Sequence, residues 1–243
     1  MIGGLRSFPD RPALFRAAAE LLAETAQRAV REAGCFTLVL SGGSTPRELY
    51  SRLAGPPFAS RLPWSRIRFY WGDERCVARS HPQSNFRMAW EALLAHVPVA
   101  EGNVHPMPAD APTPAQGARR YERTLRALAL QQGRFPPRFD LVLLGLGADG
   151  HTASLFPGGP ECAQRRRWCV PSLAPRGAEV RRRITLTLPV LNAARCVVFL
   201  VSGAQKRETL RQALQPPERK RFALPAQLVR PEGELWWLAD FPL

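Results

Sequence analysis

Short apolar stretches alternate along the chain with longer segments in which apolar residues recur every three or four positions. Short apolar stretches bounded by glycine, proline or polar residues are typical of buried strands, whereas the longer spacing is typical of helices that bury one face. The predicted strands are 36–40, 67–71, 139–144, 184–188, 196–201 and 235–238. The predicted helices are 12–32, one that follows residue 45, 85–96, 114–132 and 204–214.

This alternation predicts an α/β fold, with a mostly parallel, Rossmann-like sheet flanked by helices on both faces. The chain shows no internal repeat and no linker long enough to separate two domains, so residues 1–243 are interpreted as one domain. In such sheets ligands bind beyond the carboxyl ends of the strands. The residues that follow each predicted strand are therefore the candidates for a functional site.

A glycine-rich loop, Gly42-Gly43-Ser44-Thr45, follows the first of these strands. Its two glycines allow the backbone to approach a ligand closely. Thr45 is expected to cap the next helix, with a proline at the first helical position and Glu48 completing a capping box. Free N–H groups at a helix start, together with two hydroxyls, favour an anion site. An ordinary glycine turn with a helix cap is the alternative.

The stretch FDLVLLGLGADGHTASLFPG, residues 139–158, has G-x-G-x-x-G spacing at Gly145, Gly147 and Gly150. A dinucleotide-binding turn with this spacing opens a helix and is followed about 20 residues later by an acidic residue. Here Pro157 interrupts any helix, and no acidic residue stands where one is needed. The glycines therefore do not predict a dinucleotide site.

What remains is a glycine-rich turn that presents Asp149 and His151 at a strand end. An imidazole is suited to general-base chemistry near neutral pH, and a carboxylate two residues away can orient it or stabilise its charged form. A histidine that only satisfies the loop is the alternative interpretation.

Charged residues stand at three more strand ends. Asp73, Glu74 and Arg75 follow one predicted strand, where they indicate either a solvated loop or a partner for a sugar hydroxyl or phosphate. Arg183 precedes another predicted strand, and Lys206 follows a third. Either residue is a surface charge or one side of a phosphate site, where arginine gives bidentate contacts and lysine a point charge.

The net charge of +14 at pH 7 suggests nucleic acid as a partner, but the pattern of charges does not support it. The arginines are dispersed along the chain, and the denser runs at 165–167 and 181–183 are not interleaved with aromatic residues as stacking platforms are. A small anionic substrate is the more economical use of a few of these charges.

Composition also bears on location and metals. No apolar run approaches the length of a membrane span, and the N-terminus lacks the order of a secretion signal, so a cytoplasmic protein without a membrane partner is expected. The five cysteines form no C-x-x-C pair, which indicates free thiols. The four histidines show no metal-ligand spacing.

Six segments together resemble one enzyme family, the 6-phosphogluconolactonases. They are SGGSTPRELY, FYWGDER, SNFRMAWEALL, FDLVLLGLGADGHTASLFPG, RRRITLTLPVLNAA and LVSGAQKRETL, in the family's order and approximate spacing. The resemblance covers nearly the whole chain and places it in the fold group of glucosamine-6-phosphate deaminases and ribose-5-phosphate isomerases.

The resemblance implies hydrolysis of 6-phospho-D-glucono-1,5-lactone to 6-phospho-D-gluconate in the oxidative pentose phosphate pathway, with no metal or organic cofactor. His151 matches the family's proposed base, and Asp149 would support it. A phosphosugar lactone is the implied partner, and the chain is expected to be a monomer or a weak homo-oligomer. The implied substrate-binding residues are Gly42, Gly43, Ser44, Thr45, Arg47, Asp73, Arg75, Arg183 and Lys206.

The chain departs from the family pattern at several positions. Gln83 stands where an aspartate is frequent, and Arg47 replaces a frequent lysine while keeping its charge. The loop APRGAEVRRR is more basic than usual, which leaves open which of Arg181, Arg182 and Arg183 meets the substrate.

Three competing functions remain. Glucosamine-6-phosphate deaminases carry a glutamate just before the proline that follows Asp-Gly-His, and here Phe156, which cannot transfer a proton, occupies that place. A non-catalytic phosphosugar-binding protein would keep the Gly42–Thr45 loop but would not need Asp149 and His151. A basic nucleic-acid module would show strongly salt-dependent binding of polyanions and no lactonase activity.

Overall fold

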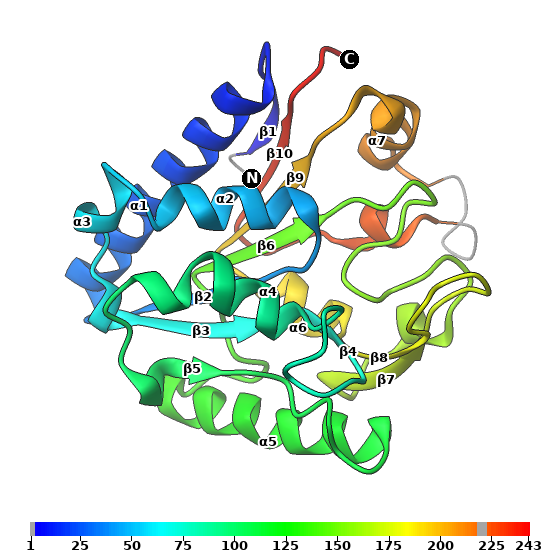
Figure 1. Cartoon of the computed structure of the whole chain (residues 1–243). Helices are drawn as coiled ribbons and strands as arrows, with labels where there is room; N and C mark the ends of the chain where they lie inside the picture. The colour runs from blue at the N-terminus through cyan, green and yellow to red at the C-terminus, as the bar shows by residue number, and fades with distance from the viewer. Residues whose placement is uncertain (1–2, 218–222) are drawn as a thin grey trace.

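The structure of the chain, a computed structural model, describes residues 3–217 and 223–243 (Figure 1). Its main sheet has seven strands, all parallel, in the order β1-β10-β9-β6-β2-β3-β5. The central strands are apolar on both faces, as strands covered on both sides must be. In chain order the seven are β1 (Gly4–Ser7), β2 (Phe36–Leu40), β3 (Ile67–Trp71), β5 (Val104–His105), β6 (Leu141–Gly145), β9 (Cys196–Val201) and β10 (Glu234–Ala239).

Helices cover both faces of this sheet, which confirms the predicted fold class. The helices α1, α2 and α4 pack side by side on one face, and α6 lies behind the sheet in Figure 1. The bounds are α1 (Arg11–Ala33), α2 (Ser44–Leu53), α3 (Phe58–Arg61), α4 (Asn85–Ala92), α5 (Pro114–Gln132), α6 (Leu188–Asn192) and α7 (Arg207–Leu214). No helix in the described ranges is long and apolar enough to cross a membrane.

A second, antiparallel sheet was not predicted. It consists of β4 (Asp73–Arg75), β8 (Arg182–Leu186) and β7 (Cys169–Leu173), in that order. The strand predicted at 184–188 is β8, which begins two residues earlier and belongs to this small sheet. The sequence pattern missed β1, β4, β5 and β7, because these strands are short or largely polar and exposed, and β7 contains a proline.

Two helix starts show where local signals succeeded and failed. Thr113 caps α5, the helix predicted at 114–132, and its Oγ1 accepts from the backbone N–H of Gln116 at 3.2 Å. The predicted capping role of Thr45 is wrong, because α2 begins one residue before it, at Ser44, with Gly43 as the cap. Gly43 has a φ of 108°, a conformation that favours glycine, and no side chain caps this helix.

The remaining differences concern helix ends and thiols. The helix predicted at 85–96 ends at Ala92 and is followed by a short 3-10 turn, and the one predicted at 204–214 begins with such a turn before α7. All five cysteines are free thiols, as expected.

Candidate active site

The strand order places a topological switch point at the centre of the main sheet. The chain runs outward from β2 to β3 and β5 on one side, and from β6 to β9 and β10 on the other. Loops that leave the carboxyl ends of β2 and β6 therefore diverge to opposite sides and leave a crevice between them, which is where ligands bind in sheets of this kind. The first loop is Gly42–Thr45, and the second carries Asp149 and His151.

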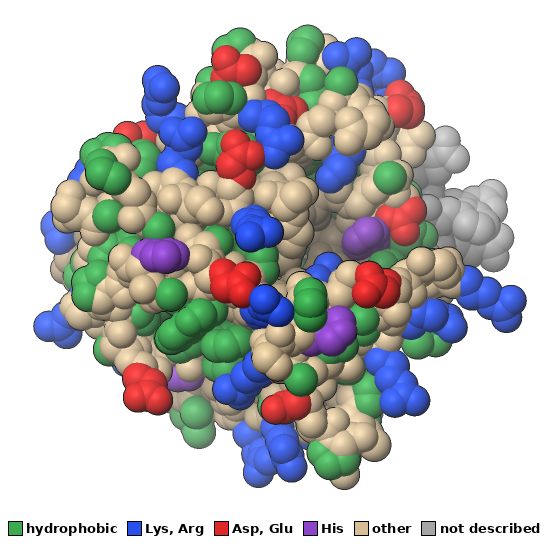
Figure 2. All heavy atoms as spheres, in the orientation of Figure 1, with side chains coloured by type: hydrophobic (Ala, Val, Ile, Leu, Met, Phe, Trp, Pro, Cys, Tyr) green, Lys and Arg blue, Asp and Glu red, His purple; other side chains and the backbone are tan. Residues whose placement is uncertain are grey.

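A cavity of about 240 Å³ lies at this point. Figure 2 shows a hollow on the same face, with histidine, acidic and basic side chains near its rim. Among the predicted site residues, those that line the cavity are Gly42, Gly43, Ser44, Thr45, Asp73, Arg75, His151, Arg183 and Lys206. Residues separated by up to 164 positions in the chain (206 minus 42) thus meet in one space.

His151 and Asp149 form a close pair at the edge of this cavity. The Nδ1 of His151 lies 2.5 Å from Oδ1 of Asp149, and the same oxygen accepts the backbone N–H of His151 at 3.1 Å. Partial burial by itself would raise the pKa of the Asp149 carboxyl, but the hydrogen bonds from His151 outweigh it and the pKa is lowered. With the Nδ1 proton donated to this carboxylate, Nε2 carries the lone pair and can accept a proton.

Close packing around the pair explains the glycine at position 147. A Cβ there would lie 2.1 Å from Nδ1 of His151 and 2.7 Å from Oδ1 of Asp149, so only glycine lets the pair rest against the turn. The backbone holds the turn closed as well, because Gly147 N–H donates to the carbonyl oxygen of His151 at 2.9 Å. Of the three glycines in the G-x-G-x-x-G spacing, Gly147 is thus the one that makes room for the histidine pair.

Two cationic side chains from different parts of the chain line the same cavity. Lys206 follows β9, and burial lowers the pKa of its ammonium although Asp240 opposes the shift. Arg183 comes from β8, and burial likewise lowers the pKa of its guanidinium, with the charge of Asp73 opposing. Burial destabilises the charged form of each side chain, and a bound anion would stabilise that charged form again. Both residues are therefore suited to a phosphate.

The structure separates the three arginines of the basic loop. Arg181 and Arg182 are exposed, and Nε of Arg181 donates to the carbonyl oxygen of Ala174. Arg183 alone of the three lines the cavity, with its Nη1 3.9 Å from Oδ2 of Asp73.

Asp73 and Glu74 are not a solvated loop; both are buried. Asp73 Oδ2 accepts from the hydroxyl of Ser154 at 2.6 Å, and its backbone carbonyl accepts from Nδ2 of Asn85 at 2.9 Å. These contacts tie β4 to the turn after β6 and to the start of α4, so the cavity wall is held from three elements.

Glu74 secures the start of α4 beneath the cavity. Its carboxylate accepts the backbone N–H groups of Asn85 at 2.7 Å, Phe86 at 2.8 Å and Arg75 at 2.8 Å. Burial raises the pKa of this carboxyl, with the three donors opposing the shift.

We expect Glu74→Ala to lower the free energy of unfolding by about 2–5 kcal/mol, because it leaves one buried and two partly buried N–H groups without their acceptor. Urea denaturation followed by circular dichroism measures the loss. Glu74→Gln keeps one acceptor oxygen and should lose clearly less. Equal stability of wild type and Glu74→Ala would contradict this role.

Two predicted site residues do not line the cavity. Arg47 is exposed on the first turn of α2, and Asp149 contributes through His151 only. Gln83, where the family often has an aspartate, contacts the site through its backbone. Arg75 Nη1 donates to the carbonyl oxygen of Gln83 at 2.8 Å, so this contact does not depend on the side chain at position 83.

Asn85 is a cavity residue that sequence reasoning missed. Its Oδ1 is buried without a hydrogen-bond partner, and a Cβ on Gly42 would lie 1.9 Å from that oxygen. Donation by Nδ2 to Asp73 fixes which way the amide points, so the unpaired acceptor lies on the side of Gly42. Asn85 lies in SNFRMAWEALL, one of the segments that resemble the lactonase family. Within that segment it looks like an ordinary residue at a helix start, so the sequence did not single it out. Leu146, Ala153 and Leu200 also line the cavity unpredicted.

Comparison with known proteins agrees with this geometry. The family described as glucosamine-6-phosphate isomerases/6-phosphogluconolactonase matches residues 9–237. A 6-phosphogluconolactonase of Synechocystis sp. is 45% identical over 214 residues, which is 88% of this chain and 85% of that protein. The solved 6-phosphogluconolactonase of Trypanosoma brucei has a TM-score of 0.85 at 29% identity, covering 98% of this chain and 96% of its own.

A monomeric glucosamine-6-phosphate deaminase has a TM-score of 0.76 over 96% of both chains, and at 21% identity this likeness concerns the fold alone. The family match, by contrast, extends over most of the chain and includes every segment that lines the cavity. The chain therefore belongs to the glucosamine-6-phosphate isomerase/6-phosphogluconolactonase family.

Proposed function

We propose that this protein hydrolyses 6-phospho-D-glucono-1,5-lactone to 6-phospho-D-gluconate, with His151 as the general base. The reaction belongs to the oxidative pentose phosphate pathway. The observation that carries the proposal is the 2.5 Å contact between His151 Nδ1 and Asp149 Oδ1, at the edge of a cavity that also holds Lys206 and Arg183.

In the proposed reaction, Nε2 of His151 takes a proton from water as the water oxygen attacks the lactone carbonyl carbon. The resulting imidazolium is stabilised by the Asp149 carboxylate, whose lowered pKa keeps it ionised at neutral pH. The tetrahedral intermediate then collapses, the bond to the ring oxygen breaks, and Nε2 returns its proton to that oxygen. One water is consumed, and the new carboxyl group loses its own proton to solvent.

The phosphate of the substrate is proposed to lie between the start of α2 and the two cations. No side chain caps α2, so the N–H groups of its first turn remain available to an anion in the part of the chain that the structure describes. Lys206 and Arg183 add charge-assisted hydrogen bonds. Anchoring the phosphate positions the carbonyl beside His151, so that binding energy assists the chemistry.

A deaminase reaction fits the site less well. The ring of Phe156 lies with its centroid 5.0 Å from that of His151, at the position where deaminases carry a glutamate. An aromatic ring excludes water on that side but cannot transfer a proton, and the ring-opening step of a deaminase needs such a group.

The direct test of the proposal is the rate of lactone hydrolysis above the spontaneous rate. We expect a strong enhancement with the 6-phosphorylated lactone and a much smaller one with glucono-1,5-lactone. Deamination of glucosamine 6-phosphate with no lactonase activity would support the rival, and no turnover of either substrate would leave a phosphosugar-binding protein. The cytoplasmic location and the monomeric or weakly oligomeric state stay predictions.

We expect EDTA to leave the hydrolysis rate unchanged, because the proposed step draws its base from His151 and its positive charge from arginine and lysine. The measurement is turnover before and after dialysis against the chelator. Loss of activity that zinc or magnesium restores would contradict a metal-independent reaction.

A further inference from the structure

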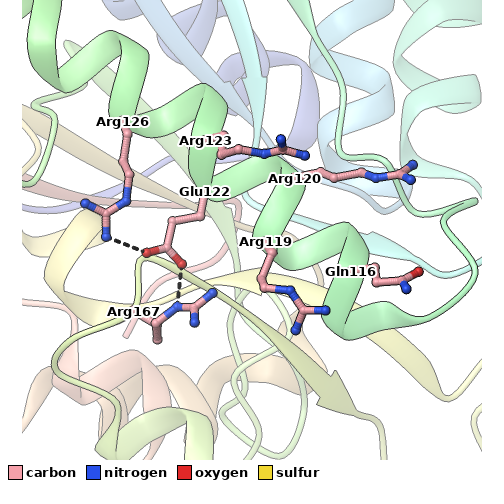
Figure 3. Close-up of a pocket in the computed structure, with 7 residues that line it drawn as sticks. All are labelled: Gln116, Arg119, Arg120, Glu122, Arg123, Arg126 and Arg167. Carbon is pink, nitrogen blue, oxygen red and sulfur yellow. Dashed lines mark hydrogen bonds and ion pairs between the residues drawn. The ribbon is translucent and has the colours of Figure 1, made fainter.

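A second concave site lies on α5, apart from the candidate active site. It is a groove of about 550 Å³ whose walls are almost entirely arginine, and it shares no lining residue with the cavity at the switch point. Figure 3 shows the side chains that form it, and Lys and Arg side chains gather at the lower edge of the face in Figure 2, over the position of α5 in Figure 1. The lining residues are Gln116, Arg119, Arg120, Glu122, Arg123, Arg126 and Arg167.

One buried carboxylate organises one side of this groove. Glu122 is 4% exposed, and its two oxygens accept from Arg126 at 3.1 Å and from Nε of Arg167 at 2.6 Å. The guanidinium of Arg126 also lies over the ring of Trp168, 4.9 Å from its centroid. Two arginines from distant parts of the chain are thus held in fixed positions, and their free N–H groups remain at the groove.

On the other side of the groove, the positive charge of the arginines is not balanced by acidic residues. Arg119, Arg120 and Arg123 are exposed, and in the described ranges none of them has a hydrogen bond or an ion pair to an acidic group. Positions 119 and 123 are four apart and 120 and 123 three apart, so these like charges are neighbours on the helix and destabilise it slightly. Glu122 is the single acidic residue of α5, against four arginines.

We propose that this groove binds a small molecule carrying two or more phosphates, of the oligophosphate or nucleoside polyphosphate class. The five guanidinium groups and one carboxylate that line the groove give it a local charge of +4 (five minus one), which a single phosphate does not neutralise. Arginine forks match phosphate oxygens in pairs. A concave volume of this size suits a small molecule, whereas a protein partner needs a far larger surface.

The test is titration calorimetry with tripolyphosphate, performed with 6-phosphogluconate present in excess. The added 6-phosphogluconate occupies the phosphate site at Lys206 and Arg183, so that only the α5 groove remains for tripolyphosphate. We expect saturable binding of one tripolyphosphate per chain at about 0.1 M salt, weakening as salt is raised. Arg119→Gln/Arg123→Gln should weaken it by at least about tenfold, the loss expected when two charge-assisted contacts are removed.

The matched control is Arg28→Gln/Arg31→Gln, which removes the same charge from exposed positions one turn apart on α1. We expect this variant to bind as tightly as wild type, and both variants to melt at the wild-type temperature. Because the readout is binding and not turnover, a failure here is distinguishable from a failure of the lactonase proposal.

A second titration, with ATP, distinguishes the two sources of phosphate. Tighter binding of ATP than of tripolyphosphate supports a nucleotide, and equal binding supports an inorganic oligophosphate. The proposal is overturned if no saturable binding is seen, or if both double variants weaken binding equally, since bulk charge then explains it. It is also overturned if a single-stranded oligonucleotide binds far more tightly than either small molecule through the same arginines.

Discussion

His151→Ala is expected to lower kcat for the phosphorylated lactone by about 10²–10⁴-fold, the usual contribution of a general base. The imidazole Nε2 is the group proposed to take the proton from water, and its partner at Nδ1 lies 2.5 Å away on Asp149. Binding of 6-phosphogluconate, measured by calorimetry, should change little, because His151 is proposed to act at the lactone carbonyl and not at the phosphate.

Asp149→Asn serves as the companion variant. It leaves the backbone N–H of His151 an acceptor but removes the charge that stabilises the imidazolium, so we expect a smaller loss of kcat than in His151→Ala. The imidazole ring is partly exposed, with 37% of its side chain accessible, and added imidazole should restore part of the activity of His151→Ala. Turnover of His151→Ala near that of wild type would remove this residue from the mechanism.

The pH dependence of turnover bears on the Asp149 carboxyl. The pKa of Asp149 is lowered in the folded protein, so this carboxyl is ionised over the whole neutral range and protonates only under more acidic conditions than a free aspartate. We therefore expect that protonation of Asp149 does not lower kcat/KM on moderate acidification, and the pH profile of kcat/KM measures this.

Lys206→Ala is expected to lower kcat/KM for the phosphorylated lactone by about 10- to 150-fold. Charge-assisted hydrogen bonds contribute about 1.5–3 kcal/mol each, and Lys206 lines the cavity beside the start of α2. Hydrolysis of glucono-1,5-lactone, which lacks the phosphate, should barely change. The measurement is the ratio of kcat/KM for the two substrates in wild type and variant.

The adjacent Arg207 provides the matched control for Lys206. It carries the same charge, is exposed at the start of α7 and does not line the cavity, so Arg207→Ala should leave both substrates unaffected. Equal losses on both substrates in Lys206→Ala would mean that this lysine supports the fold or the chemistry and not the phosphate. Removal of the phosphate from the substrate should itself cost more than any single side chain, because Arg183 and the helix start lose their partner as well.

Local signals were sufficient for the elements that carry the site. The apolar runs at β2, β3, β6 and β9 predicted buried strands, because a parallel sheet covered on both faces needs near-continuous apolar residues. The loops after these strands were recognisable by glycines and by polar residues that buried strands do not contain. Which of their side chains meet substrate stays a prediction, although the structure brings most of them to one cavity.

Other parts of the site depend on contacts that no local pattern records. Asp73 and Glu74 have the composition of a solvated turn, and they are buried because Ser154 and the start of α4 supply their hydrogen bonds. Asn85 has the composition of an ordinary helix start. Its unpaired oxygen becomes visible only when Gly42 is packed against it.

The arginines show most clearly the difference between what the sequence predicts and what tertiary contacts decide. The sequence alone determined the α/β fold class, the succession of buried strands, the glycine-rich turns and the resemblance to a lactonase family, because these follow from periodicity and from residues that are neighbours in the chain. Four arginines of the groove are already neighbours along α5, but Arg167 comes to them through Glu122, which lies 45 positions away in the chain. Only the tertiary structure decided the approach of Arg167, just as it decided the convergence of Gly42, His151, Arg183 and Lys206. The physical reason is that electrostatic and hydrogen-bonding partners are set by distance in space, and packing of the sheet and its helices determines that distance.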